Sequence, residues 1–396
     1  MQRSHTTCFE LAAAATVLLL PVAGAIAADW AMYRGPDHNG ISAETGWFDP
    51  SAKVKVLWSK QVGTGFSSVS VAGGRAYTTG NSNGKDTVFC FNAGSGREIW
   101  KFSYACGLGA KYYEGGTHAT PTIDGDRVYT FSKYGHLFAL DAAKGAKIWG
   151  IKVQAKPPTW GFAGSPLVLG NLLIVNAGPA GMAFNKNTGK VVWQSGTGVS
   201  GYSTPVPFER GGETLIALFA AKSVIVVRAG DGKKVWEHPW QTKYSVNAAD
   251  PVVAGDTIFI SSGYNRGCSL LRIGKGKIWE NKNMRTKMYG CVLLKDRLYG
   301  CDTGGSLRCL DIKTGKKLWS HKGMGMGTQM VADGKLIVLS ERGKLIIGEP
   351  GPSGLKELAS GQVVSGRCWS VPVLANGLIY ARSSKGNLAC VSVGKK

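Results

Sequence analysis

The stretch that decides the fold, residues 139–149, reads A-L-D-A-A-K-G-A-K-I-W. Its pattern is a short apolar strand, an Asp or Asn, a turn closed by Gly, a mostly basic step, and a β-branched or Leu residue before Trp. The acidic or amide side chain bonds the local backbone, and Gly takes the positive-φ position, so each copy predicts a β-hairpin. Clear copies occur at residues 90–100, 183–193 and 309–319, and a looser copy occurs at 226–236.

The tryptophans of these copies recur every 40–49 residues. Periods of about 40–45 residues are typical of the four-stranded blades of a β-propeller. One hairpin cannot bury its own Trp, so each copy needs copies on either side. The series consists of Trp58, Trp100, Trp149, Trp193, Trp236, Trp279 and Trp319.

A second set of hairpins lies between the tryptophan copies and follows the same period. Each has a two-residue turn between apolar or β-branched residues, and most of these dipeptides suit type I′ or II′ turns. There are eight, which predicts eight blades. The turns are Gly73-Gly74, Asp124-Gly125, Gly170-Asn171, Gly211-Gly212, Gly255-Asp256, Lys295-Asp296, Asp333-Gly334 and Asn376-Gly377.

The last blade lacks its outermost strand within the C-terminal sequence. A spare strand at residues 53–62, which carries Trp58, lies at the other end of the chain. We therefore expect an all-β, eight-bladed β-propeller of four-stranded antiparallel blades, in which this N-terminal strand completes the last blade. The seventh outer hairpin has Leu358 in place of Trp. The propeller domain spans residues 53–396, after an extension at 28–52 that is packed on the ring.

Residues 1–27 have the features of a secretory signal peptide. Arg3 precedes an apolar run at residues 11–26, and Ala25-Ile26-Ala27 is a small-x-small cleavage signal. We expect a soluble protein that is exported to the periplasm or the extracellular space. It should not be lipidated, because Cys8 lies far upstream of a plausible attachment site. No other apolar run is long enough for a transmembrane segment.

The formal net charge is +22, and many of the lysines lie in the predicted outer turns. A solvated rim is the simpler interpretation, and affinity for an anionic polymer or membrane surface is the alternative. No aromatic–basic nucleic-acid motif is present, and we expect no nucleic-acid partner. Eight cysteines remain after the leader. Cys90, Cys309 and Cys390 share one repeat position and are expected to be core residues, whereas Cys106 and Cys368 are the better candidates for a disulfide.

The eleven-residue repeat resembles the tryptophan-docking motif of quinoprotein propellers, the PQQ-like repeat. The mature chain is similar to secreted PQQ-like repeat proteins that open with W-x-x-(aromatic)-R-G-P and N-G-I-S-x-E-T-G, here at residues 30–36 and 39–46. This group includes both alcohol dehydrogenases and non-catalytic scaffolds such as the BamB-like propellers of outer-membrane assembly. The resemblance therefore implies the fold and leaves the activity open.

The dehydrogenases of that group hold PQQ with Ca²⁺, an Asp base and a disulfide between neighbouring cysteines. This sequence has no neighbouring cysteines and no clustered acidic set with evident Ca²⁺ spacing, so no cofactor is predicted, although PQQ with calcium remains possible. The G-x-G-x-x-G match at residues 196–201 precedes a strand and is interpreted as an inter-blade turn. We predict no catalytic or metal-binding residues.

A small ligand would bind at the channel mouth, where the inner strands begin. The side chains there are rich in aromatics, as a site for a planar ligand would be. In the simpler alternative these rings plug the channel and pack against one another, and His118 is either a ligand-site residue or a hydrogen-bonded structural one. The candidate ring is Phe66, His118, Trp160, Tyr202, Asn247, Tyr289, Gln329, Arg367 and Trp369.

We expect an exported, monomeric, non-catalytic propeller that acts as a binding or scaffold protein in the cell envelope. Its partner would be a protein, an envelope polymer or a small planar ligand. The first alternative is a PQQ-dependent dehydrogenase of alcohols or sugars. The second is a BamB-like outer-membrane protein assembly factor.

Overall fold

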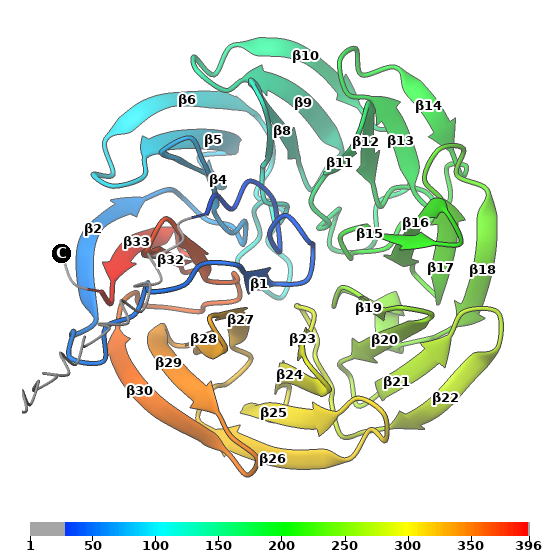
Figure 1. The fold of residues 1–396 in the computed structure, drawn as a ribbon. Coiled ribbons are helices and arrows are strands. Elements are labelled where there is room, and N and C mark those ends of the chain that lie inside the picture. The colour runs from blue at the N-terminus through cyan, green and yellow to red at the C-terminus, as the bar shows by residue number, and fades with distance from the viewer. Residues whose placement is uncertain (1–27, 395–396) are drawn as a thin grey trace, which may run out of the picture.

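The computed structural model describes residues 28–394, so the predicted signal peptide at residues 1–27 lies outside the described part. Eight antiparallel sheets surround a central axis like the blades of a propeller (Figure 1). The eight-bladed, all-β prediction is confirmed. Within residues 28–394, no helix combines the length and the apolar character needed to cross a bilayer.

The first four blades follow one another along the chain, each running from the inner strand to the outer strand. Blade 1 has β3 (Ser70–Ala72), β4 (Arg75–Ser82), β5 (Lys85–Asn92) and β6 (Glu98–Ala105), and blade 2 has β7 (Thr122–Asp124), β8 (Arg127–Phe131), β9 (His136–Asp141) and β10 (Lys147–Lys152). Blade 3 has β11 (Leu167–Leu169), β12 (Leu172–Val175), β13 (Met182–Asn185) and β14 (Val191–Gln194). Blade 4 has β15 (Val206–Arg210), β16 (Glu213–Phe219), β17 (Ser223–Arg228) and β18 (Lys234–Pro239).

A short 3₁₀ turn, η1 (Lys243–Ser245), leads into the second half of the ring. Blade 5 has β19 (Val252–Ala254), β20 (Thr257–Ser262), β21 (Gly267–Arg272) and β22 (Gly276–Asn281), and blade 6 has β23 (Val292–Leu294), β24 (Arg297–Asp302), β25 (Ser306–Asp311) and β26 (Lys317–Lys322). Blade 7 has β27 (Thr328–Ala332), β28 (Lys335–Leu339), β29 (Lys344–Pro350) and β30 (Leu355–Gln362). Blade 8 has β31 (Val373–Ala375), β32 (Leu378–Arg382), β33 (Asn387–Ser392) and, from the N-terminal region, β2 (Lys55–Gln61).

The ring closes as the sequence predicted. Strand β2 pairs antiparallel with β33 as the outermost strand of blade 8, and Trp58 lies opposite Cys390. In Figure 1 the blue β2 flanks the red β33. The two ends of the propeller domain are thus joined by backbone hydrogen bonds, and no blade is left with a missing strand.

The inner hairpins use the predicted two-residue turns, with one correction. Seven turns fall at the predicted residues, but in blade 2 Asp124 pairs with Arg127, so the turn is Gly125-Asp126. Gly125 has φ +58°, and glycine adopts this left-handed conformation without the steric cost that a Cβ brings. The position of this glycine therefore sets the register of the hairpin.

In six of the eight blades the Trp of the outer strand fastens its blade to the next one; among residues 28–394, no such indole hydrogen bond is formed by Trp236 of blade 4, and blade 7 has Ala359 at this position. The indole Nε1 of Trp100 donates a hydrogen bond of 3.0 Å to the Ala142 carbonyl of blade 2, and Trp149 donates one of 3.0 Å to the Lys186 carbonyl of blade 3. The same bond, at 2.9–3.0 Å, runs from Trp58, Trp193, Trp279 and Trp319 to Ala93, Ala229, Ile312 and Gly351.

Two features shape the outer turn of blade 2. Asp141 Oδ1 accepts hydrogen bonds from the backbone N–H groups of Ala143 and Lys144, at 2.9 and 2.7 Å, as predicted for the acidic position. Gly145 has φ +71°, and a Cβ added there would lie 2.5 Å from the ring of Trp100. The glycine therefore serves the turn and also leaves room for the Trp of the preceding blade.

Blade 7 departs from the pattern. Ala359 lies opposite Ile347, in the register that Trp319 occupies opposite Cys309 in blade 6. The prediction that Leu358 replaces Trp is wrong by one residue, because the hairpin that joins these paired positions in β29 and β30 is longer than the corresponding hairpin of blade 6. Ala359 packs against the apolar cluster that blades 7 and 8 share.

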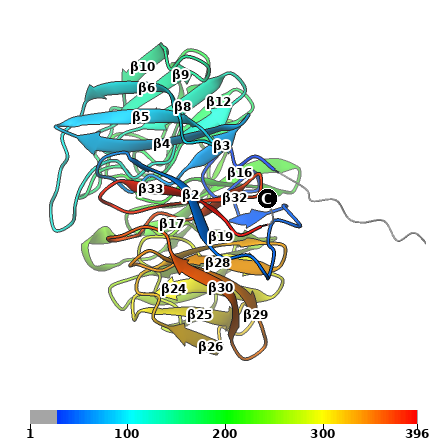
Figure 2. The same cartoon turned by 90° about the vertical axis from the view of Figure 1, so that its left-hand side faces the viewer.

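The extension at residues 28–52 packs across inner hairpin turns. Trp30 bridges to Val71 of blade 1, and β1 (Ile41–Ser42) pairs in parallel with β27 of blade 7. The carboxylate of Glu44 accepts hydrogen bonds of 2.6 and 2.8 Å from the N–H groups of Asn376 and Gly377. The dark blue extension crosses the middle of the ring in Figure 1 and lies on one side of it in Figure 2. It covers one end of the channel.

All eight cysteines at positions 90–390 are free and buried. Cys90, Cys309 and Cys390 are core residues, as predicted. The prediction of a disulfide that involves Cys106 and Cys368 is wrong, because both thiols are free. The two cysteines also have different neighbours: Cys106 lies near Asp86 and Lys133, and Cys368 lies near Glu341.

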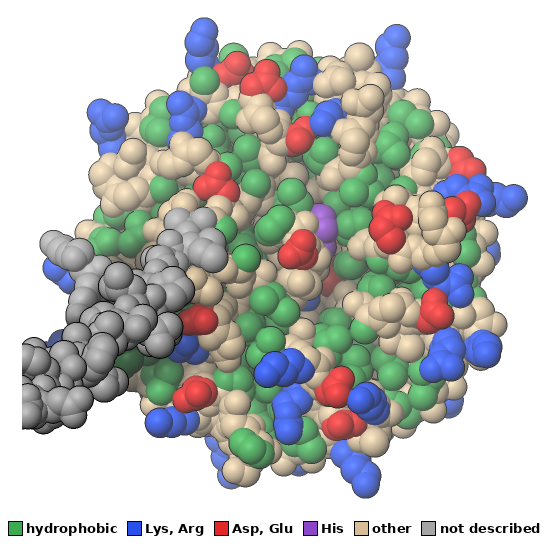
Figure 3. All heavy atoms as spheres, in the orientation of Figure 1, with side chains coloured by type: hydrophobic (Ala, Val, Ile, Leu, Met, Phe, Trp, Pro, Cys, Tyr) green, Lys and Arg blue, Asp and Glu red, His purple; other side chains and the backbone are tan. Residues whose placement is uncertain are grey.

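On the face that carries the extension, many Lys and Arg side chains project at the outer edge (Figure 3). This arrangement agrees with a solvated basic rim.

Removing one docking Trp should destabilise the ring. Trp100→Ala is expected to lower the free energy of unfolding by about 3–5 kcal/mol, because it empties the space between blades 1 and 2. The matched control is Ile99→Ala, since the neighbouring Ile99 is exposed, and it should cost less than about 0.5 kcal/mol. Urea denaturation followed by circular dichroism measures both. A loss below about 1 kcal/mol for Trp100→Ala would contradict the docking role.

Gly145 and Trp100 should be energetically coupled. Gly145→Ala is expected to cost about 1–2 kcal/mol for the left-handed backbone and about 1–3 kcal/mol for the clash with the indole. In a Trp100→Ala background the second part should vanish, so a double-mutant cycle should give a coupling of about 1–3 kcal/mol. Additive effects would show that the ring does not limit this position.

Candidate functional site

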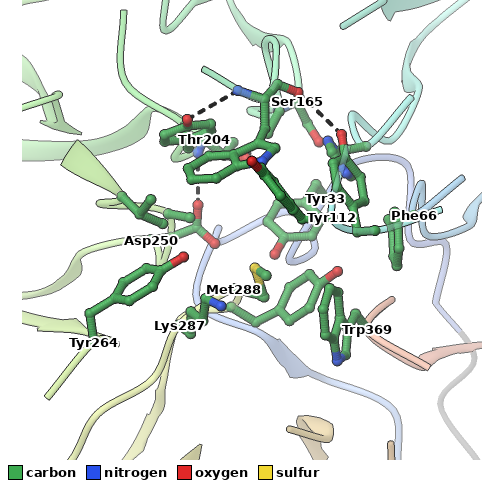
Figure 4. A pocket seen from close by; sticks show the side chains of 18 residues that line it. Tyr33, Phe66, Tyr112, Ser165, Thr204, Asp250, Tyr264, Lys287, Met288 and Trp369 are labelled. Carbon is green, nitrogen blue, oxygen red and sulfur yellow. Dashed lines mark hydrogen bonds between the residues drawn. The ribbon is translucent and has the colours of Figure 1, made fainter. Parts of the chain in front are cut away.

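A cavity of about 170 Å³ lies at the end of the channel opposite the extension. Its lining comes from residues just before or within the starts of the inner strands, together with inter-blade loops. Phe66 and Trp369 lie on one side of the cavity and Tyr264 lies on the other (Figure 4). Six of the nine predicted ring residues line it: Phe66, His118, Trp160, Tyr202, Tyr289 and Trp369.

The three other predicted residues have different roles. Asn247 is buried, and its amide donates to the carbonyls of Ala220 and Trp240, both at 3.0 Å. Gln329 donates to the Gly290 carbonyl at 3.0 Å. Arg367 forms a 2.8 Å ion pair with Glu114 and covers the outer side of Trp369, with its guanidinium carbon 4.6 Å from the ring centroid. Each supports the fold around the cavity and does not line it.

The sequence did not identify several lining residues. Tyr33 reaches the cavity from the extension, Tyr112 and Tyr113 come from the loop between blades 1 and 2, and Tyr264 and Lys287 come from loops of blade 5 and before blade 6. The unusual number of aromatic residues in residues 103–116 was a usable signal for the tyrosine pair. The positions of Tyr264 and Lys287 carry no repeat signature.

Lys133 holds the loop that carries Tyr113 in place. The ammonium of this buried lysine donates to the carbonyl of Gly109 at 2.8 Å, to that of Leu108 at 3.2 Å, and to the Tyr113 hydroxyl at 2.9 Å. Burial lowers the pKa of Lys133. Three oxygen partners compensate for the desolvation of the charge and fix the loop against blade 2.

The starts of the inner strands are joined across the blades by a ladder of hydrogen bonds. Each backbone N–H donates to a side-chain oxygen at the equivalent position of the next blade, at 2.7–3.0 Å. The ladder ends at Asp250, a carboxylate where the preceding blades have hydroxyl groups. Its steps are Ser68 to Thr120, Thr120 to Ser165, Ser165 to Thr204, and Thr204 to Asp250.

Asp250 is the carboxylate of the cavity. It is buried, and its Oδ1 accepts the Thr204 N–H. The Tyr33 hydroxyl lies beside the carboxylate, but no hydrogen bond of normal length and angle from the described residues reaches Oδ2. Burial raises the pKa of the carboxyl, whereas the nearby Arg34 guanidinium lowers it. In Figure 4 the carboxylate points toward the interior of the cavity. A buried oxygen without a partner is costly, so this atom is a candidate contact for a hydrogen-bond donor.

The aromatic rings that line the cavity pack against one another without filling it. Phe66 stacks on Trp369 with a centroid separation of 5.5 Å and lies 5.1 Å from His118, while Trp160 lies 6.2 Å from Tyr202. Burial lowers the pKa of His118 to about 3, and its Nδ1 has no hydrogen-bond partner. His118 is therefore neutral at physiological pH, and the site is an apolar, aromatic cavity with one carboxylate at its floor and Lys287 at its side.

These residues do not fit PQQ with calcium. Ca²⁺ requires six to eight oxygen ligands, usually with several carboxylates. The cavity lining contains one carboxylate, and no group of three or more His, Cys, Asp or Glu residues between positions 28 and 394 could hold a metal ion. The cavity is also smaller than the ~300–1,000 Å³ that is usual for cofactor-sized ligands.

The family model that matches this chain is described as outer membrane protein assembly factor BamB. It matches residues 84–321 and 303–395, which is most of the propeller. The BamB of Moranella endobia (strain PCIT) is 22% identical over 332 residues, 75% of this chain and 80% of the relative. The BamB of Yersinia pestis is 21% identical over 333 residues, 76% of this chain and 79% of the relative.

Solved structures agree on the fold. The structure of BamB from Moraxella catarrhalis superposes with a TM-score of 0.64 at 17% identity, covering 86% of this chain and 98% of the other. The quinohemoprotein alcohol dehydrogenase from Comamonas testosteroni gives a TM-score of 0.72 at 12% identity, covering 93% of this chain and 81% of the other. Both enzymes and non-enzymes thus share this architecture, so the likeness extends to the fold alone.

The neutral state of His118 should make stability depend on pH. Its pKa is lower in the folded protein than in the unfolded chain, so the unfolded state binds the extra proton and stability falls as the pH drops from about 6.5 toward 4. His118→Gln should reduce this fall in the free energy of unfolding, measured by urea denaturation between about pH 4 and 8. His38→Gln is the comparison, because burial also lowers the pKa of His38, to about 4, outside the cavity. An unchanged pH profile in His118→Gln would contradict the buried neutral state.

Proposed function

The chain belongs to the family described as outer membrane protein assembly factor BamB, and on this basis we propose that it is a non-catalytic propeller that binds protein partners during outer membrane protein assembly. The observation that carries the proposal is a family match across nearly the whole propeller. This function is the second alternative of the sequence analysis, and it is more specific than a general envelope scaffold.

The cavity face supports a binding role. Its polar groups are few, its walls are aromatic, and its loops are anchored by ion pairs and buried hydrogen bonds, as in Lys133 and the Arg367–Glu114 pair. Rigid aromatic side chains bury large areas at low entropic cost, which suits contact with a protein. In this proposal the protein is exported to the cell envelope and needs no PQQ or metal ion for its role.

Deleting the gene in the source organism tests this function. Strains without it should contain less outer-membrane β-barrel protein in the membrane fraction, measured by quantitative mass spectrometry. The intact chain should restore the normal amounts. A destabilised ring, such as the Trp100→Ala variant, should restore them only partly.

Unchanged amounts of outer-membrane proteins in the deletion strain would refute the proposed role. The dehydrogenase alternative makes the opposite forecast: the purified chain, given PQQ and Ca²⁺, would reduce a dye with alcohols as substrate. We expect no such reduction.

A further inference from the structure

We propose that the cavity mouth binds an acidic segment of a protein partner and takes one tyrosine or tryptophan side chain of that segment into the cavity. This inference rests on the proposed function as a protein-binding propeller and specifies the chemistry of the partner. It is argued from the size of the cavity, its unpaired floor and the charge around its mouth.

The size of the cavity suits a single ring. Its volume is about 170 Å³, and a protein cavity of roughly 150 Å³ lined by apolar side chains is known to accept benzene. Aromatic rings wall the cavity from both sides, with Phe66 and Trp369 opposite Tyr264. One inserted aromatic side chain would contact these faces in offset or edge-to-face geometry.

The floor of the cavity selects for a ring with a polar tip. The Oδ2 of Asp250 is buried and aimed into the cavity, and no hydrogen bond of normal length and angle within the described chain satisfies it, although the Tyr33 hydroxyl lies beside the carboxylate. A tyrosine hydroxyl or an indole N–H can donate to it, whereas a phenylalanine ring would leave the carboxylate unpaired. The preferred anchor is therefore tyrosine or tryptophan.

The mouth is surrounded by a basic–aromatic collar. Each of three tyrosines has a lysine ammonium over its ring, at 5.8, 5.2 and 4.5 Å from the centroid. In residues 28–394 none of these lysines forms an ion pair, in contrast to Arg367, which is paired with Glu114. The collar consists of Lys111 with Tyr112, Lys243 with Tyr244, and Lys287 with Tyr264.

The collar tyrosines also have an unusual backbone. Tyr112, Tyr244 and Tyr264 have φ values of +65°, +64° and +53°, a left-handed conformation that bulky residues rarely adopt. Tyr112 is 89% exposed and Tyr244 is 58% exposed, so burial of these two side chains in the core does not account for it. Strained residues of this kind cluster at ligand-binding sites.

The unpaired charge of the collar is positive, so the flanks of the bound segment should be negative. Glutamate or aspartate residues on either side of the anchor could meet the three ammonium groups without displacing an existing carboxylate. The electrostatic part of this binding is exposed and should weaken as salt is added.

Fluorescence anisotropy with short labelled peptides tests the proposal. The probe is a peptide with one tyrosine flanked by glutamates, and it should bind the purified chain in a salt-dependent manner. Replacing its tyrosine by alanine, or its glutamates by lysines, should weaken binding at least about tenfold, which corresponds to ~1.4 kcal/mol.

Protein variants locate the binding site. Lys111→Glu/Lys243→Glu/Lys287→Glu should weaken binding at least about tenfold, as should Ala248→Phe, which fills the cavity. Asp250→Asn should reduce the preference for a tyrosine probe over a phenylalanine one. The matched control, Lys147→Glu/Lys190→Glu/Lys316→Glu, makes the same charge change on exposed outer-turn lysines and should leave the affinity unchanged. Circular dichroism verifies that each variant is folded.

Equal binding of the lysine-flanked probe, or unchanged affinity in a folded Ala248→Phe variant, would overturn the proposal. Collar-dependent binding of anionic phospholipid vesicles or heparin, without binding of the acidic peptide, would also overturn it, because the partner would be of another class. The proposed function is tested separately: a deletion strain that loses outer-membrane proteins, with no peptide binding, would retain that function and remove only this inference.

Discussion

The contact between the Trp of one blade and the outer turn of the next is the constraint on which the ring depends. The indole donates to a backbone carbonyl of the neighbouring blade and occupies the space that a missing Cβ leaves at the turn glycine. A blade is not stable alone, because its exposed Trp would present a large apolar face to water. Each blade therefore needs a neighbour with a matching outer turn, and the repeat in the sequence follows from this geometry.

The candidate site is a consequence of that closure. The ring brings eight strand starts, which are spread from about residue 66 to residue 370, to one end of the channel. The repeat supplies the same backbone position each time, and the hydrogen-bond ladder shows how one equivalent position can change its chemistry. Blades 1 to 4 place a hydroxyl residue there, and blade 5 places the carboxylate of Asp250. A binding site can thus evolve on this scaffold by changing single residues while the ladder stays intact.

The sequence predicts the fold well and the site only in part. The number of blades, seven of the eight inner turns and the completion of the last blade by the N-terminal strand follow from periodicity, because each blade repeats the same local rules. The ring of strand starts identifies Phe66 and Trp369 but includes Asn247, since sequence position does not show whether an amide faces the channel or the backbone. Tyr33 and Lys287 come from segments without a repeat, and their approach to the cavity depends on long-range packing that no local pattern encodes.

The pairing of β2 with β33 has a consequence for how the protein folds. The chain is synthesised from its N-terminus, so β2 emerges before every other strand of the blades and has to remain without its neighbour until more than three hundred further residues have followed. Contacts of such long sequence separation slow folding. Lysines at both ends of the strand, Lys55 and Lys60, would discourage wrong pairing during this interval. The pairing of β2 with β33 is thus the last step in closing the ring. A chain that ends before β33 would leave β2 without its partner and blade 8 incomplete.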